Sequence, residues 1–370
     1  MLNKFFYCMI MGVFLMCAGV PGLMALETPI EITDDMGRTI TFDKPVERVA
    51  FAHPSAGEGI LLAGGWDKVV GRDATLSNTD FYPNLDEIPV INSPNNPHGI
   101  DFEKATSVAP DVVVIQWVGD KDAYEKMVQA LEPDIKVVML DFCEPENADN
   151  IVKLGKILGT SDKADAYAAF HDQVIDSIKS KTNSLSDSEK PNIFLDSGGM
   201  GTETITTYGK QAPFWGKMCD IAGGKSIAAD LPGGRSTVDL EWLINQDIDD
   251  IIVQCFYEKG KLSAVGESKS FGYMATDPAH ATKEADSIIS DVKNLEVYAN
   301  SDAVKNNKIF IQFWELANNP KSFIGTAYIA KWIHPELFED LDPKQIHQEY
   351  LNTYIGSDID LDNVGILAYP

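Results

Sequence analysis

The sequence predicts an α/β fold in which two lobes with mainly parallel sheets are joined by a long helix. The first observation is length, because 370 residues exceed the usual size of a domain with one hydrophobic core. Second, short runs of Val, Ile and Leu alternate with helical patterns, which favours parallel sheets covered on both faces. Third, one strand-and-helix segment occurs in both halves of the chain, which predicts two lobes of like topology.

The N-terminal segment, residues 1–25, differs from the rest of the chain. Lys4 is its only charge, Phe5 to Met16 is continuously apolar, and small residues lead to Ala25. This is the outline of a signal peptide, too short to be a spanning helix, so export from the cytoplasm is expected. An uncleaved N-terminal anchor is the alternative. Cys17 also leaves lipid attachment open, although Met16 stands where lipoprotein signals have a small residue.

Residues 26–146 are predicted to form the N-terminal lobe. A β-hairpin is expected at its start, in the segment IEITDDMGRTITF. Short apolar strands of a parallel sheet follow, separated by helical patterns. These strands are expected at Arg48 to Ala52, Lys68 to Val70, Asp111 to Gln116 and Lys136 to Leu140.

Residues 147–185 are predicted to form the connecting helix. Apolar residues such as Leu154, Leu158 and Phe170 recur there at helical spacing without an intervening strand. Residues 186–370 then form the C-terminal lobe. Its strands are expected at Asn192 to Asp196, Asp250 to Gln254 and Lys308 to Gln312.

The repeated segment reads IDFEKATSVAPDVVVIQW at residues 100–117 and VDLEWLINQDIDDIIVQC at residues 238–255. The two copies align without gaps, and apolar positions stay apolar. The matching polar pairs are Asp101 with Asp239, Glu103 with Glu241, Asp111 with Asp249, and Gln116 with Gln254. Helix capping and chance explain some of these matches. The other interpretation is two similar lobes whose strand ends face one cleft, where ligands of open α/β sheets bind.

The composition excludes several classes of function. A net charge of −26, from 56 acidic and 30 basic residues, argues against nucleic acid as a partner, because phosphate contacts need clustered Lys and Arg. The chain has no nucleophile elbow, P-loop, HExxH or dinucleotide-binding motif. The sequence therefore favours binding over catalysis, with no cofactor and no dedicated metal site. Cys143, Cys219 and Cys255 allow at most one disulfide and form no CxxC zinc site.

Candidate ligand-binding residues follow the predicted strands, at the edge where ligands bind. His53 and Ser55 follow the first strand and Arg72 the second, while Arg235 lies in PGGRST, where glycines allow close approach. Guanidinium groups suit carboxylates and oxyanions, although ordinary surface ion pairs are the alternative. For His53, a cleft wall is the main interpretation, and a metal ligand or a structural histidine are the others.

Large aromatic residues lie just past three predicted strands, at Trp117, Tyr257 and Trp314. Aromatic rings at converging strand ends make walls for a flat or bulky ligand, whereas packing in the core is the alternative. Glu103 and Glu241 lie near the starts of the two equivalent helices, where negative charge suits the helix dipole. As a matched pair they also suit basic sockets on a pseudo-symmetric partner.

In order and spacing, these segments resemble the metal-chelate class of substrate-binding proteins that serve ABC importers, which includes receptors for ferric siderophores, haem and cobalamin. The resemblance covers nearly the whole chain after residue 25. Its most specific parts are DDMGRTITFDKPVERVA, LLAGGWDKVVGRD, IDFEKATSVAPDVVVIQW, DIAGGKSIAADLPGGRSTVDLEWLINQDIDDIIV and YIAKWIHPELFEDLDPKQIHQEYLNTY.

The resemblance implies a rigid helix between the lobes, a ligand cleft and modest closure on binding. It implies that Glu103 and Glu241 meet arginines on the two permease subunits. It also adds Met200 and Thr202, in the loop after the strand NIFLD, to the cleft residues. The chain departs from the commonest family pattern by a long insertion at residues 258–300.

The function that the resemblance implies is that of a monomeric extracytoplasmic receptor without enzymatic activity. It would capture an iron chelate (siderophore or haem) or a corrinoid, and deliver it to a permease dimer with ATPase subunits. A small oxyanion such as molybdate is the alternative ligand. The alternative class is an exported enzyme or metal-cluster protein on a related two-lobed fold, which requires the three cysteines to converge.

Overall fold

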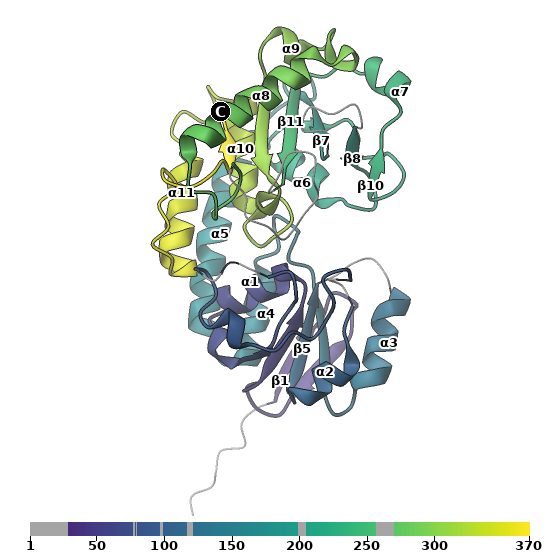
Figure 1. Ribbon diagram of the computed structural model, residues 1–370, viewed down its shortest axis with the longest axis vertical. Coiled ribbons are helices and arrows are strands. Elements are labelled where there is room, and N and C mark those ends of the chain that lie inside the picture. Colours follow the sequence, from purple (N-terminus) through teal and green to yellow (C-terminus); the bar gives the residue numbers. More distant parts are fainter. Residues whose placement is uncertain are drawn as a thin grey trace, which may run out of the picture.

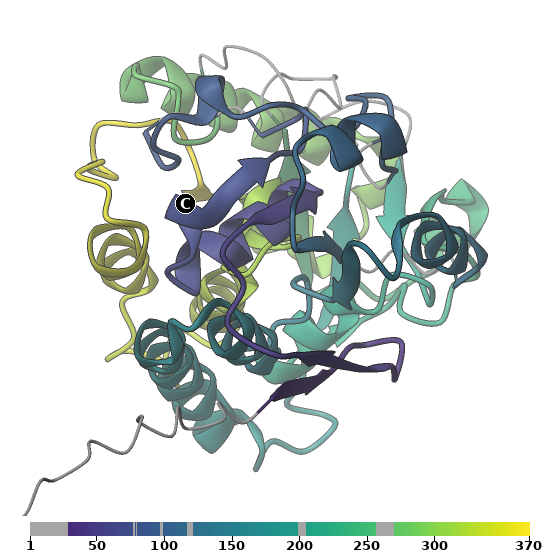
Figure 2. The same cartoon turned by 90° about the horizontal axis from the view of Figure 1, so that it is seen from below.

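The computed structural model describes residues 29–76, 78, 80–96, 99–116, 121–198, 205–256 and 270–370. Two α/β lobes follow one another along the long axis of the molecule, the N-terminal lobe below and the C-terminal lobe above in Figure 1. Each lobe is built on one mainly parallel sheet with helices packed around it, which Figure 2 shows from below. The predicted fold class is therefore confirmed, while the expected signal peptide at residues 1–25 lies outside the described part of the chain.

The N-terminal lobe has a β-hairpin and a four-stranded parallel sheet of order β4-β3-β5-β6. The strands read as apolar runs because they are covered on both faces, and β5 is buried at every position. The elements are β1 Ile30–Thr33, β2 Thr39–Phe42, β3 Val49–Ala52, α1 Pro54–Leu62, η1 Trp66–Lys68, β4 Val69–Gly71, η2 Leu85–Glu87, α2 Phe102–Ser107, β5 Val112–Gln116, α3 Lys121–Leu131 and β6 Lys136–Leu140.

The C-terminal lobe has a five-stranded sheet of order β13-β12-β11-β7-β9, parallel except for β13 at its edge, and a small antiparallel pair, β8 with β10. Its elements are β7 Asn192–Asp196, β8 Thr206–Tyr208, α6 Phe214–Ile221, β9 Lys225–Ser226, β10 Arg235–Thr237, α7 Leu240–Ile244, β11 Asp250–Cys255, α8 Pro278–Asn294, η3 Glu296–Tyr298, α9 Asp302–Lys305, β12 Ile309–Phe313, η4 Trp314–Leu316, α10 Ser322–Ile333, α11 Pro343–Glu349, η5 Tyr350–Ile355 and β13 Ala368–Tyr369. The strands predicted for both sheets are present, shifted by at most one residue at an end.

The internal repeat has a structural counterpart in the two sheets. The order β4-β3-β5-β6 in one lobe corresponds to β9-β7-β11-β12 in the other. The carboxylate of Asp111 accepts from the backbone N–H of Arg48 at 2.9 Å, and that of Asp249 accepts from the N–H of Asn192 at 2.8 Å. Each matched aspartate therefore fastens the start of the neighbouring central strand, so these two residues serve the fold.

The range 147–185, expected as one connecting helix, contains two helices, α4 at Asp149–Leu158 and α5 at Ser161–Thr182. Gly159 ends α4 in the left-handed conformation with φ of 71°, which glycine adopts without strain. The helical periodicity continues across this break, so spacing alone did not reveal it.

Helix α5 joins the two lobes and runs alongside both of them (Figure 1). Near its start the Tyr167 hydroxyl donates to the carbonyl oxygen of Pro320 at 2.9 Å. Near its end the Thr182 hydroxyl donates to the carbonyl oxygen of Ile221, in the C-terminal lobe, at 2.8 Å. Buried side chains along α5 thus belong to one core that continues through both lobes.

The described part of the insertion, from residue 270, forms helix α8 and a turn of 3₁₀ helix against the C-terminal sheet. Residues 257–269 lie outside the described part. Across the described ranges, no helix combines the length and apolar character needed to cross a membrane.

We predict that Asp250→Asn stabilises the protein at pH 8 but much less at pH 5. The carboxylate of Asp250 is buried, lies 3.7 Å from Lys308 Nζ, and has no hydrogen-bond partner among the described residues. Burial, opposed in part by Lys308, raises the pKa of Asp250 from 3.8 to about 7. The folded protein then holds this proton more tightly than the unfolded chain, so wild-type stability falls as pH rises from about 4 through 7.

Urea unfolding at the two pH values measures this effect. The difference between Asp250→Asn and wild type should grow by about 2 kcal/mol from pH 5 to pH 8. Asp302→Asn, at an exposed carboxylate, is the control and should show no such change. A pH-independent difference for Asp250→Asn would contradict the prediction.

Candidate functional site

The candidate site lies where the carboxyl ends of the two sheets meet. In a parallel sheet all strands end at one edge, and side chains that follow β3 and β6 contact residues that follow β12 of the other lobe. This is the inter-lobe face that the repeat predicts. The two halves of this face are built differently.

The turn from β3 into α1 is held in an unusual backbone conformation. His53 has φ of 79°, which is rare and strained for a residue with a side chain. Its Nδ1 accepts from the N–H of Ser55 at 3.2 Å and so caps α1, while its own N–H donates to the buried carboxylate of Asp73 at 3.1 Å. The other Asp73 contacts include Thr75 and Asn92, so this carboxylate organises the turn.

Arg72 has a local structural task. Its guanidinium donates to the carbonyl oxygens of Ile88 and Asp73 at 3.1 Å and of Leu76 at 3.4 Å. These bonds fasten the loop that follows β4. They use Nε and Nη1 of Arg72, which is much of the hydrogen-bonding capacity of its guanidinium. The predicted contact of Arg72 with a ligand stays a prediction.

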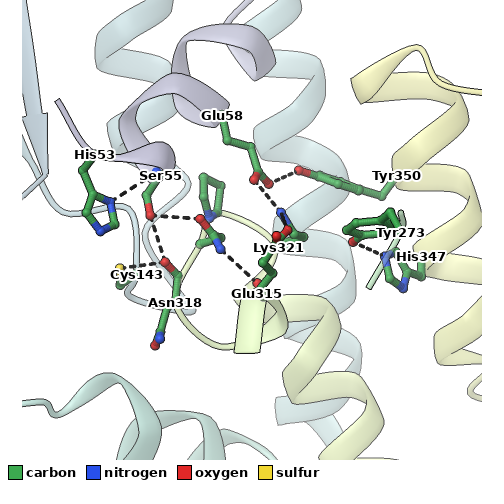
Figure 3. A network of polar contacts seen from close by, with 12 residues as sticks. His53, Ser55, Glu58, Cys143, Tyr273, Glu315, Asn318, Lys321, His347 and Tyr350 are labelled. Atoms are coloured by element: carbon green, nitrogen blue, oxygen red, sulfur yellow. Dashed lines mark hydrogen bonds and ion pairs between the residues drawn. The ribbon is translucent and has the colours of Figure 1, made fainter. Parts of the chain in front are cut away.

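Ser55 and Cys143 of the N-terminal lobe form hydrogen bonds with residues of the C-terminal lobe (Figure 3). The Ser55 hydroxyl lies 2.9 Å from the carbonyl oxygen of Asn318 and 3.0 Å from Oδ1 of Asn319. The Cys143 thiol donates to the same Asn318 carbonyl at 3.1 Å. Both side chains therefore contact the other lobe in this conformation.

A buried ion pair lies beside this contact, as Figure 3 shows. Glu58 of α1 pairs with Lys321, just before α10, and only 3% and 1% of these side chains are exposed. The second oxygen of Glu58 accepts from the hydroxyl of Tyr350, and Glu315 lies 3.3 Å from the Lys321 ammonium. We call these four residues the inter-lobe hub. Sequence reasoning missed it, because a charge pair 263 residues apart leaves no spacing signal.

The second histidine at this junction is held neutral. His347 Nε2 lies 2.8 Å from the hydroxyl of Tyr273, beside the hub. Burial, and to a lesser extent the charge of Lys321, lowers the pKa of His347 to about 3. The hub therefore gains no further positive charge at neutral pH.

The C-terminal half of the face combines one guanidinium with aromatic rings. Arg235 donates from Nε and Nη2 to the hydroxyl and carbonyl oxygens of Ser197, both at 3.1 Å. The guanidinium lies 5.8 Å from the centre of the Phe256 ring, which stacks against Trp314 with ring centres 6.4 Å apart. Phe256 was missed, although it directly follows β11; the prediction named its neighbour Tyr257.

Two matched glutamines end the central strands. Gln116 is paired on both sides, accepting from the N–H of Phe142 at 2.9 Å and donating to Asp141 at 2.8 Å. Gln254 accepts from the Tyr208 hydroxyl at 3.1 Å, whereas its buried Nε2 has no partner among the described residues. The C-terminal lobe thus holds a spare buried donor next to the aromatic wall.

Several predicted site residues lie outside the described part of the chain. They are Trp117, Met200, Thr202 and Tyr257. The segments that contain them begin directly after β5, after the first residues beyond β7, and after the first residue beyond β11. Their ligand contacts stay predictions.

Glu103 and Glu241 are exposed near the starts of α2 and α7. The preceding matched aspartates cap the two helices alike: Asp101 accepts from the N–H of Lys104 at 3.2 Å, and Asp239 from that of Trp242 at 3.0 Å. The two glutamates are therefore presented in equivalent local settings.

The three cysteines in the described part of the chain are free thiols, with Cys219 and Cys255 buried and Cys143 partly exposed. Within the ranges that the structure describes, no three His, Cys, Asp or Glu side chains are placed to hold a metal ion. The geometry therefore gives no support to the metal-cluster alternative.

Comparison with known proteins settles the class. The periplasmic binding protein family matches residues 49–312, more than half of the chain. The chain belongs to this family. It is a solute receptor of the ABC-importer type that works outside the cytoplasm with a membrane permease, and the expectation of a receptor rather than an enzyme is confirmed by the family.

Two solved structures share the fold of this chain, and one curated protein is similar in sequence over most of its length. The TroA-like periplasmic binding protein FepB from Veillonella parvula has a TM-score of 0.73 at 23% identity, covering 92% of this chain and 99% of that one. The vitamin B12 binding protein BtuF of Vibrio cholerae has a TM-score of 0.56 at 16% identity, covering 78% and 97%. The molybdate-binding protein MolA of Haemophilus influenzae is 20% identical over 362 residues, 91% of either chain.

We predict that Lys321→Met destabilises the protein by about 3–5 kcal/mol, because it leaves the Glu58 carboxylate buried without its counter-charge. Glu58→Gln combined with Lys321→Met should recover a large part of that loss. Denaturant unfolding of both variants measures the coupling. Equal destabilisation by the single and double substitutions would contradict the prediction.

We predict that Cys143 in residues 26–370 reacts with iodoacetamide at pH 8 at least about 10-fold more slowly than free cysteine. Burial raises the pKa of this thiol well above its usual value, and the thiol donates to Asn318. Labelling followed by mass spectrometry gives the rate, with Cys143→Ser as the control. Alkylation at the rate of free cysteine would show that the inter-lobe contact is open in solution.

Proposed function

We propose that the receptor captures a bulky metal chelate, either an iron chelate (siderophore or haem) or a corrinoid, and delivers it to the importer. The observation that carries this proposal is the wall formed by Arg235, Phe256 and Trp314. Stacked rings offer a broad apolar surface, and the guanidinium at their edge suits carboxylate or other anionic oxygens. A large ligand with an apolar body and acidic groups fits both.

A small oxyanion is the rival ligand, supported by the similarity to MolA of Haemophilus influenzae. An oxyanion is bound best where several N–H donors surround it, as at helix N-termini and paired arginines. Among the described residues of the wall, Arg235 is the one cation, and two of its N–H groups already bond Ser197. The chelate is therefore the better-supported ligand.

Three further parts of the function are proposed with it. Residues 1–25 act as a signal peptide that is removed on export. The mature receptor works as a monomer. Glu103 and Glu241, exposed in equivalent settings on the two lobes, meet basic residues of the permease dimer.

The decisive experiment titrates residues 26–370 with a ferric catecholate, a ferric hydroxamate, haemin, cyanocobalamin and molybdate, following tryptophan fluorescence and calorimetry. Trp314 lies in the wall, so a bound chelate should quench its emission. We expect saturable one-to-one binding of one chelate class. Binding of molybdate alone would establish the oxyanion as the ligand. The absence of a fluorescence change and of heat with all five compounds would contradict the proposed ligand class.

We predict that Arg235→Ala weakens binding of that chelate by about 10-fold or more, since a hydrogen bond to a charged group is worth about 1.5–3 kcal/mol. Arg235→Lys keeps the positive charge but loses the planar set of N–H donors, so its affinity should lie between those of Arg235→Ala and the wild type. Lys305→Ala, at an exposed cation on α9, is the matched control. An Arg235→Ala variant with wild-type affinity would remove this residue from the site.

A further inference from the structure

Large apolar side chains are exposed at few places in the described part of the chain. They are Phe102 at 39%, Leu240 at 49%, Ile244 at 47% and Met274 at 42% exposure. Three of the four lie on α2 and α7, the short helices of the internal repeat. Scattered exposed apolar residues need no explanation, but this concentration on one pair of matched helices does.

The two helices carry the same exposed pattern. Phe102 stands between Asp101 and Glu103, and Leu240 stands at the matching position between Asp239 and Glu241. We call Phe102 with Glu103 the N-terminal tip, and Leu240, Glu241 and Ile244 the C-terminal tip. Helix α2 lies near the lower end of the molecule and α7 near its upper end in Figure 1. A partner that contacts both tips must therefore be extended and must offer two similar sites.

The C-terminal tip adjoins a surface pocket that has been given no role above. The pocket has a volume of ≈ 360 Å³, and the apolar residues Leu231, Pro232, Val238 and Trp242 line it together with polar residues that include Thr207 and Asp239. Thr207 is 1% exposed, and its hydroxyl has no partner among the described residues. An apolar pocket with one spare buried hydroxyl is suited to an inserted side chain.

We propose that the two tips are the apolar contacts of the receptor with the permease dimer, and that the pocket beside α7 takes an apolar side chain of one permease subunit. This inference rests on the proposed receptor function. The occupant presents basic and apolar residues together, because each tip pairs an exposed glutamate with an exposed apolar side chain and the chain as a whole carries a charge of −26.

The apolar contacts then supply most of the docking energy. Exposed ion pairs contribute little and weaken with salt, whereas apolar groups desolvated in a pocket act as hot spots. The tips are also unequal, since the second exposed apolar residue, Ile244, and the pocket belong to the C-terminal lobe. On a two-fold partner with two equivalent sites, the C-terminal tip therefore contributes more binding energy than the N-terminal tip.

The test measures binding of residues 26–370 to the permease–ATPase complex of the same organism, held in nanodiscs, at low and high salt. Leu240→Ser with Ile244→Ser should weaken binding about 10-fold or more at both salt concentrations, and Phe102→Ser about threefold. Met274→Ser, an equally exposed apolar residue on neither tip, is the matched control and should bind as wild type. Glu103→Gln with Glu241→Gln should lose affinity mainly at low salt.

The outcomes separate this inference from the proposed function. A wild-type receptor that fails to bind the complex would overturn both. A wild-type receptor that binds, with tip variants that bind equally well, would overturn the inference alone. Self-association of the wild type in sedimentation, abolished by the Leu240 and Ile244 substitutions, would assign the surface to a second copy of the chain and overturn it as well. The chelate titration should be unchanged in every tip variant.

Discussion

The inter-lobe hub is the constraint on which the rest of the molecule depends. Glu58 comes from the first helix of one lobe and Lys321 from the other lobe, and neither charge is stable in a protein interior without the other. Tyr350 and Glu315 complete the coordination of the pair, and Tyr167 of α5 bonds the adjacent Pro320. Because the two charges must stay together, the separation of the lobes next to α5 is fixed, and the cleft takes its shape from that anchored side.

The two lobes repeat the same sheet around this anchor, but they finish it differently. Matched aspartates fasten the central strands of both sheets, and matched aspartates cap α2 and α7. The C-terminal lobe then adds an antiparallel edge strand, the β8 and β10 pair, and helix α8. Of the wall residues, Arg235 lies on the added strand β10, whereas Phe256 and Trp314 directly follow β11 and β12 of the repeated sheet, so the wall combines the shared frame with one addition.

Much of the frame could be predicted from the sequence, because buried parallel strands are continuous apolar runs and helices follow them with capping aspartates. The site was harder. Arg72 and Arg235 look alike in sequence, since each follows a strand or a glycine pair, yet carbonyl oxygens surround Arg72 whereas Arg235 lies against Phe256. The hub could not be predicted, because its members are far apart in the chain. The break at Gly159 was missed because the apolar spacing continues through it.

The shared carbonyl of Asn318 has a consequence for how the lobes part. The hydroxyl of Ser55 and the thiol of Cys143, both from the opposite lobe, donate hydrogen bonds to this one oxygen. A ligand oxygen at this position would accept the same two hydrogen bonds, so the two donors would pass from a protein acceptor to a ligand acceptor. Parting of the lobes would then exchange one hydrogen-bond acceptor for another instead of leaving two buried donors unpaired.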